Sequence, residues 1–459
     1  MSANTGILTN NNGYYQSSTV YYSPTATIAT TGEVLGSLYC FLSRVKAWPV
    51  DTEPPAPTED QKNLKETFKN IFVAKKITSS DMSPVIERID WTSGQVYDYY
   101  RDDVNMFALE PNGTILRRFY VKNRFDQVFK CLWNNSGGVV STEPFFEPGN
   151  FNANQIFQGA DDYKWKYMYT ITSGNKLKFM DDAWMPIPVS STVPNPVSSF
   201  AGYGSIDVIN VTNGGSGYNP ATSPITVTIN GDGQLASANV VVVGGSINDI
   251  VVANTGSNYS YSSVTITSAT GSNATAFAPT SPIGGHGYNP ATELGSRHIM
   301  LTARFNRDEN GNLPTDIDFR QIGLLVNPLA RYGTTIQRAN AAIYSTTTNF
   351  TLSQGFGAYT PDETVYQSPN GLLTSATFTA TVLSFNTATN LVKLINTLGN
   401  ANNSAVLYGA TSGTSRVVVN QAPPPDFITF SGYLTYLENR EPVQRNADGS
   451  EIFKLVLGY

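Results

Sequence analysis

Residues 200–283 contain an internal repeat that limits the folds this segment can adopt. INVTNGGSGY at 209–218 returns as IVVANTGSNY at 250–259, a period of 41 residues. Each copy precedes a short run in which Thr alternates with Val or Ile, ITVTI at 225–229 and SVTIT at 263–267. Such alternation is typical of strands, and the glycines favour turns between them. Two copies of strand, glycine turn and strand predict a small β-domain with internal pseudo-symmetry.

The composition extends this expectation to the whole chain. Only 14% of the residues are charged, against roughly 25% in an ordinary soluble domain, and Asn, Thr, Ser, Gly and Tyr take their place. The net charge of −6 argues against the basic face that nucleic acid binding requires. Cys40 and Cys131 lie in apolar runs and are expected as buried thiols. The first residues do not resemble a signal peptide, and no apolar run approaches the roughly 20 residues of a membrane span.

We therefore predict a mainly β, multi-domain chain with a β-sandwich-type scaffold, few helices and two inserted small β-modules. The second module ends at a run of three prolines, 423–425, and the last strands flank an Asp448-Gly449 turn. The predicted segments are an extended N-terminal arm at 1–33, a scaffold β-domain at 34–200, an inserted Gly/Thr-rich module at 201–283, a scaffold continuation at 284–343, a second inserted module at 344–425, and C-terminal scaffold strands at 426–459.

One helix is predicted in the scaffold, at about 58–76. Thr58 is a candidate N-cap, with Gln61 three residues later as in a capping box. Apolar residues then recur at helical spacing, namely Leu64, Phe68, Ile71 and Phe72. YKWKYMYTI at 163–171 alternates instead, which predicts a strand with an aromatic face and a second face that carries lysines.

No catalytic, cofactor-binding or metal-binding residue is predicted. The two histidines, His286 and His298, match no zinc-ligand spacing. Ser216 lies in GGSGY, which lacks the order of a nucleophile elbow. Asp161 and Asp162 are adjacent and would point to opposite faces of a strand, so they are expected as a solvated turn. The chain is not expected to be an enzyme. Weakly charged surface and abundant aromatics favour a protein that works by forming interfaces.

Several separated blocks resemble the baseplate wedge subunit of contractile-tailed bacteriophages, the family called gene product 8 in T-even phages. The most specific are DFRQIGLLVNPL at 318–329 and YLTYLENREPV at 433–443. The others are PTEDQKNLKETF, ERIDWTSGQVYDYY, RRFYVKNRFDQVFKCLWN and GADDYKWKYMYTI. The likeness covers roughly residues 34–200, 284–343 and 426–459, and the two inserted modules have no counterpart in it.

The resemblance implies a structural protein without enzymatic activity or cofactor. It implies a mainly β virion protein of the tail baseplate, assembled in the host cytoplasm. It would be a homodimer within each wedge, bound to other wedge proteins, and would help couple host attachment to sheath contraction. No contact with nucleic acid and no membrane insertion is expected. The motif residues are interpreted as core, turn or interface positions, and they are Trp91, Trp165, Phe319, Arg320, Glu438, Asn439 and Arg440.

Two further expectations concern the inserted segment at 201–283. The alternative function is a tail-fibre or adhesin-like module that binds host glycans, with Tyr218, Tyr259 and Tyr288 stacking on sugars; packing of these tyrosines against their own strands is the competing interpretation. GHGYNPA at 285–291 repeats GSGYNPA at 215–221. His286 is therefore expected at the seam where the module rejoins the scaffold, with a hydrogen bond across that seam.

Overall fold

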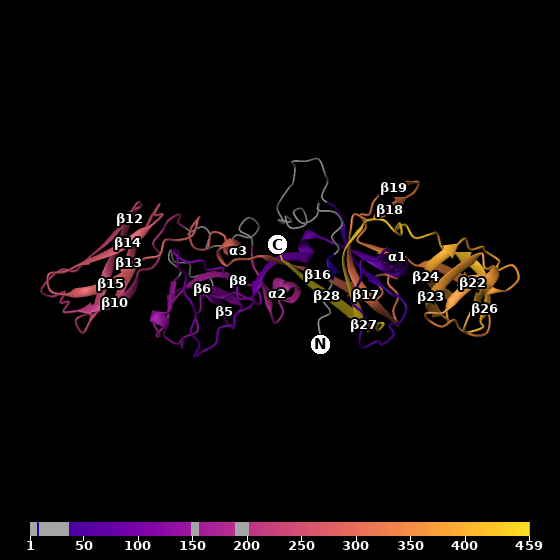
Figure 1. The fold of residues 1–459 in the computed structure, drawn as a ribbon, viewed down its shortest axis with the longest axis horizontal. Coiled ribbons are helices and arrows are strands. Elements are labelled where there is room, and N and C mark those ends of the chain that lie inside the picture. Colours follow the sequence, from indigo (N-terminus) through magenta and orange to yellow (C-terminus); the bar gives the residue numbers. More distant parts are fainter. Residues whose placement is uncertain (1–6, 9–35, 148–155, 189–201, 459) are drawn as a thin grey trace. The chain divides into compact units, whose positions relative to one another are not determined.

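The computed structural model describes residues 7–8, 36–147, 156–188 and 202–458 (Figure 1). The expectation of a mainly β chain with few helices is confirmed, with 46% of the described residues in strands and 7% helical. The chain divides into two compact units, 1–82 with 301–455 and 83–300 with 456–459. The predicted N-terminal arm lies outside the described residues except for strand β1 (Ile7–Leu8).

The first unit is built around a six-stranded antiparallel sheet whose strands come from four distant parts of the chain. Its order is β1, β27 (Tyr433–Arg445), β17 (Ile317–Val326), β2 (Leu38–Ser43), β3 (Ile71–Ile77) and β20 (Ile343–Ser345). Every residue of β17 is buried, as expected for a strand with neighbours on both edges and layers on both faces. The hairpin β18 (Leu329–Tyr332) and β19 (Thr335–Arg338) follows it.

Helix α1 (Gln61–Asn70) is shorter than the predicted helix at 58–76. Asp60, not Thr58, is the N-cap, and its carboxylate accepts the backbone N–H of Asn63 at 2.9 Å. Ile71 and Phe72 begin β3 instead of continuing the helix. β-Branched and aromatic residues fit a pleated strand, and pairing with β2 supplies backbone hydrogen bonds that a longer helix would forgo. Leu64 and Phe68 still pack on the sheet core, as their spacing predicted.

The segment predicted as the second inserted module contains a closed six-stranded barrel (Figure 1). A core of eleven buried residues fills it, among them Phe350, Val382 and Leu394. Closure leaves no unpaired strand edge, so the barrel is self-contained. Its strands are β21 (Thr348–Leu352), β24 (Leu391–Gly399), β23 (Phe378–Asn386), β22 (Thr364–Gln367), β25 (Val406–Gly409) and β26 (Ser415–Gln421).

The second unit contains a four-stranded sheet with β8 (Lys164–Thr170) between β6 (Gln127–Trp133) and β7 (Ile156–Gln158), and β5 (Tyr120–Lys122) beyond β6. The predicted alternation of β8 holds over its first half. Trp165 packs in an aromatic core with neighbouring tyrosines, while the side chains of Lys164 and Lys166 project from the opposite face of the strand. Helix α2 (Ser173–Phe179) follows β8, and β4 (Met82–Glu87) pairs with β9 (Trp184–Pro186).

The Gly/Thr-rich module forms three two-stranded sheets that interleave its two repeats (Figure 1). The first repeat supplies β10 (Asn210–Ser216), β11 (Thr226–Gly231) and β12 (Gln234–Val243). The second supplies β13 (Ser246–Ser257), β14 (Ser262–Thr267) and β15 (Ser272–Phe277). β10 pairs with β15, β11 with β14 and β12 with β13. Each strand thus pairs with the other repeat, so neither repeat completes its sheets alone.

The pseudo-symmetry of this module extends to single residues. Ile209 and Ile250, at equivalent positions of the repeat, bridge to each other. The hydroxyl of Tyr218 accepts the N–H of Ala274 at 3.2 Å, and that of Tyr259 accepts the N–H of Ala236 at 3.4 Å.

The remaining elements are α3 (Pro290–Glu293), β16 (His298–Asn306) and β28 (Ser450–Gly458).

Candidate functional site

Three lysines on one face of the second unit's sheet are buried under the Gly/Thr-rich module and its seam. Lys164 lies 2.7 Å from Asp249 of the module, and Lys166 lies 3.2 Å from Asp207. The third, Lys130 of β6, faces Lys166 across the strand pair. Adjacent buried cations repel one another unless carboxylates compensate. The junction between module and sheet is therefore held by ion pairs.

His286 and Glu293 complete this junction around Lys130. The Lys130 ammonium donates to Nδ1 of His286 at 3.1 Å and lies 3.2 Å from Oε2 of Glu293. The second oxygen of Glu293 accepts the N–H of Gly287 at 2.7 Å. The ammonium also lies 3.9 Å from the ring centroid of Tyr100. The expected hydrogen bond of His286 across the seam is present in this geometry.

The charge states of the junction follow from its burial. Burial, then the neighbouring Lys130, lowers the pKa of His286 below its ordinary value. The imidazole is thus neutral near pH 7, and its Nδ1 accepts the lysine proton. Burial opposes ionisation of Glu293, but the charge of the neighbouring Lys130 outweighs it and lowers the pKa of the carboxyl. Burial lowers the pKa of Lys130, and Glu293 counters that effect.

A second junction joins the barrel to the sheet of the first unit. Asp318 lies 2.7 Å from Arg44 and 3.0 Å from Arg320, and all three are buried. Asp362, from the segment that enters β22, lies 2.9 Å from Arg44 and 3.4 Å from Arg320. Arg320 also donates to the Val45 carbonyl at 2.8 Å. Two carboxylates and two guanidinium groups therefore alternate, and one carboxylate belongs to the barrel segment.

The other motif residues of β17 and β27 lie close together in the same unit. Asn439 is buried, and its amide accepts from Gln321 at 2.8 Å and donates to the Pro55 carbonyl at 2.8 Å. Glu438 accepts from Tyr436 at 2.9 Å and lies 3.0 Å from Arg440, whose side chain is 43% exposed. Phe319 is buried in β17. The structure thus brings Phe319, Arg320, Glu438, Asn439 and Arg440 onto adjacent strands.

Trp91 and Trp165 belong to the aromatic core of the second unit. Trp165 is fully buried and stacks on Tyr163, with ring centroids 5.6 Å apart. Trp91 is partly buried against the same core. Both are packing positions of the second unit, whereas the motif residues of β17 and β27 belong to the first unit.

Structural roles explain four of the candidate residues, Asp161, Asp162, Tyr218 and Tyr259. Asp161 accepts the N–H groups of Ser141 and Thr142 at 2.6 and 2.8 Å, and Asp162 has a φ of 60°, so this pair forms a turn. Tyr218 and Tyr259 are 4% and 5% exposed. In the described part of the chain, no group of three or more His, Cys, Asp or Glu side chains could hold a metal ion.

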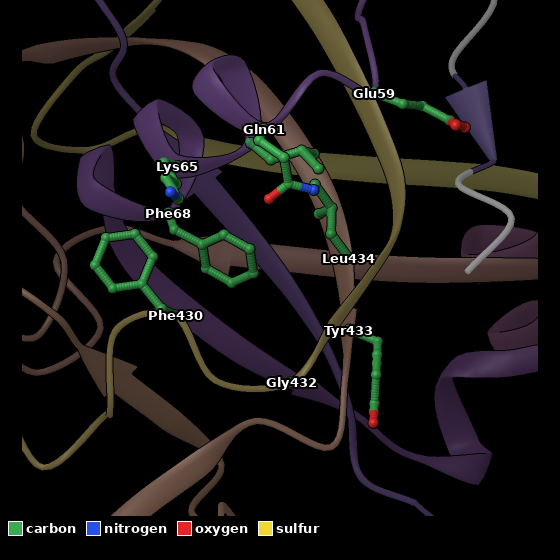
Figure 2. A pocket seen from close by; sticks show the side chains of 9 residues that line it. Glu59, Gln61, Lys65, Phe68, Phe430, Gly432, Tyr433 and Leu434 are labelled. Atoms are coloured by element: carbon green, nitrogen blue, oxygen red, sulfur yellow. The ribbon is translucent and has the colours of Figure 1, made fainter. Parts of the chain in front are cut away.

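Figure 2 shows a surface pocket of about 390 Å³ between α1 and the start of β27. Phe68 and Phe430 form its aromatic wall, with ring centroids 6.0 Å apart, and Leu64 and Leu434 add apolar surface. Glu59, Gln61 and Lys65 also line it. These polar groups are exposed, and none of the seven motif residues, nor His286, lines the pocket.

Sequence reasoning missed the acidic members of both junctions. These acidic residues are distant in sequence from the basic residues that they contact. Lys164 pairs with Asp249, Lys166 with Asp207, Lys130 with Glu293 and Arg44 with Asp362. The lysine face of β8 was the one available signal, but it could equally have been solvated.

Among the described residues, no helix combines the length and apolar character needed to cross a membrane. No protein-family model matches this chain, and a comparison with curated proteins found no match.

Proposed function

We propose that this chain is a structural subunit of a phage tail baseplate wedge. In this role it resides in the virion, binds other wedge proteins, pairs as a homodimer and helps couple host attachment to sheath contraction. One observation carries the proposal. The two blocks with the most specific resemblance, 318–329 and 433–443, form neighbouring strands in which Gln321 donates to Asn439. A shared ancestral scaffold would bring such distant blocks together.

The segments without a counterpart in the resemblance support the same proposal. The 201–283 module and the barrel each have their own sheets and their own core. Each is joined to a scaffold strand through an ion pair between a carboxylate and a basic side chain, Asp207 with Lys166 of β8 and Asp362 with Arg320 of β17. Self-contained additions on a scaffold are tolerated when the scaffold folds without them.

The glycan-binding alternative requires exposed tyrosine rings, which Tyr218 and Tyr259 do not provide. Tyr218 and Tyr259 pack on Gly271 and Gly233 of their own module, leaving almost no ring surface for a sugar. Tyr288 is 52% exposed, but it lies after the module, in the seam. We therefore propose no second function.

Assembly tests the proposal directly. The full chain is expressed together with the wedge proteins of the same phage, and complexes are separated by size-exclusion chromatography and weighed by native mass spectrometry. We expect a stable complex that contains two copies of this chain. A chain that remains monomeric and joins none of the wedge proteins contradicts the proposal.

The module can be removed in the same assay. Ser281 donates its N–H to the Ser205 carbonyl at 3.0 Å, so the two ends of the module are adjacent and a short linker can join them. Deletion of residues 206–280 uncovers Lys164 and Lys166, which water can solvate. We expect a folded chain that still joins the wedge complex. Loss of folding would show that 201–283 is an integral part of the scaffold.

A further inference from the structure

A second pocket, of about 230 Å³, lies beside the Gln321–Asn439 pair. Its lining includes Trp48, Glu66 and Thr67 as well as these two amides. All belong to the first unit. The pocket thus adjoins the side chains of the two motif strands, and no role has yet been assigned to it.

The orientation of the two amides follows from their neighbours. The Pro55 carbonyl can only accept, so Asn439 must turn its NH₂ group toward it. The remaining Asn439 oxygen then faces Gln321, which must donate. The Gln321 oxygen is therefore directed away from Asn439. This oxygen is buried and has no hydrogen-bond partner among the described residues.

The other polar groups of the lining make the pocket rich in acceptors. The Thr67 hydroxyl is buried and has no partner in the described part of the chain, although the residue is only 1% exposed. Glu66 adds a half-buried carboxylate. The indole and amide donors at the rim are already occupied, since the Trp48 indole donates to the Arg440 carbonyl at 2.8 Å and the Asn63 amide donates to Thr58 at 2.6 Å.

We propose that this pocket binds the guanidinium group of an arginine side chain supplied by a partner protein. A guanidinium has five donors and no acceptor, which complements a buried amide oxygen, a hydroxyl and a carboxylate. The indole of Trp48 offers an aromatic surface of the kind on which guanidinium groups stack. Lys46 also lines the pocket, but its side chain is exposed and its charge can remain in water. The site requires only the first unit and does not depend on the proposed function.

Calorimetric titration of the full chain with two matched peptides tests this proposal. The probes are acetyl-Gly-Arg-Gly-amide and the same peptide with citrulline, which is isosteric but uncharged and has an acceptor in place of one donor group. We expect saturable binding of the arginine peptide and roughly tenfold weaker binding of the citrulline peptide. Equal binding of both peptides, or no saturable binding of the arginine peptide, overturns the proposal.

Variants locate the binding in this pocket. Glu66→Gln and Thr67→Val should each weaken binding of the arginine peptide, and Lys46→Met should strengthen it by removing a like charge. Glu59→Gln, on the pocket of Figure 2, is the matched control and should leave binding unchanged. Glu66 is half-buried and forms no ion pair with the described residues, so its variant is expected to fold. Binding that none of the three pocket variants changes places the peptide elsewhere and overturns the assignment.

A third titration, with free arginine, separates a partner protein from a small solute. A side chain supplied by a protein needs no contact to a free α-amino group or α-carboxylate. The peptide should therefore bind at least as tightly as the free amino acid. Tighter binding of free arginine would identify a metabolite site and overturn the assignment to a partner protein.

Discussion

The Lys130 ammonium lies 3.2 Å from the Glu293 carboxylate, and their side chains are 0% and 2% exposed. A buried ion pair of this kind adds little net stability relative to an apolar pair, because both ions lose their hydration. Removing one partner lowers stability far more, because the other charge is then buried without compensation. The pair therefore fixes how the seam packs on the sheet more than it stabilises the fold.

Replacing Glu293 by Gln should leave the buried charge of Lys130 without its counter-ion. Gln can still accept the N–H of Gly287, so the substitution removes mainly the charge. We expect the unfolding free energy to fall by about 3–5 kcal/mol. Urea unfolding followed by tryptophan fluorescence measures it, since four of the five tryptophans belong to the second unit. The double variant Lys130→Met/Glu293→Gln should recover most of the loss. Additive losses in the double variant would contradict the coupling.

The exposed pair between Lys176 and Asp126 is the control for that experiment. The two side chains lie 2.7 Å apart, and the Lys176 side chain is 45% exposed. Water and salt screen such a pair, so Lys176→Gln should cost less than about 1 kcal/mol. A loss as large as that of Glu293→Gln would show that burial does not decide the effect.

The second unit should lose stability in mild acid. Burial and Lys130 lower the pKa of His286, so below about pH 6.5 the unfolded chain binds a proton that the folded chain resists. The contribution of His286 is thus complete above that pH and is lost as the pH falls. The lowered pKa of Glu293 adds a further loss below about pH 4.5. His286→Gln should flatten the dependence between pH 7 and 5, measured as unfolding free energy. An unchanged slope would rule out His286 as its source.

The two acidic residues of the barrel junction should differ in effect. Asp318 is buried between Arg44 and Arg320, whereas the side chain of Asp362 is 38% exposed. Asp318→Asn should therefore cost about 3–5 kcal/mol. Asp362→Asn should cost about 1 kcal/mol, because water already solvates part of the Asp362 carboxylate and Asp318 still compensates both arginines. Scanning calorimetry of the first unit's transition compares them, and a larger effect of Asp362→Asn would contradict this ranking.

The pseudo-symmetry of the Gly/Thr-rich module predicts a matched pair of glycine effects. A Cβ on Gly271 would overlap the ring of Tyr218, and one on Gly233 would overlap the ring of Tyr259. Both tyrosines are buried, so each Gly→Ala change should cost about 1–3 kcal/mol through overpacking. Gly174→Ala, where a Cβ meets no atom within 4 Å, is the control and should be nearly neutral. Thermal unfolding measures all three, and clearly unequal losses at Gly271 and Gly233 would contradict the symmetry.

The sequence by itself determined the elements whose signals are local. Alternation predicted β8 and the repeat predicted a symmetric β-module, and both signals lie within short strands and turns. The composition of the whole chain predicted a mainly β fold. The sequence did not predict where α1 ends. Ile71 and Phe72 fit the helical period, but β3 pairs with β2, which lies about thirty residues away. Tertiary pairing outweighs a short periodic pattern.

Only the tertiary structure decided which charges meet. Lys130 and Glu293 are 163 residues apart in sequence, and Arg44 and Asp362 are 318 apart. Nothing in the spacing of a lysine or an aspartate encodes such a partner, because an ion pair depends on a distance of a few ångströms and on the exclusion of water. The same holds for the interleaving of the repeats. The sequence repeats twice, but the choice between pairing within a repeat and pairing across repeats depends on how the two copies bury their shared core.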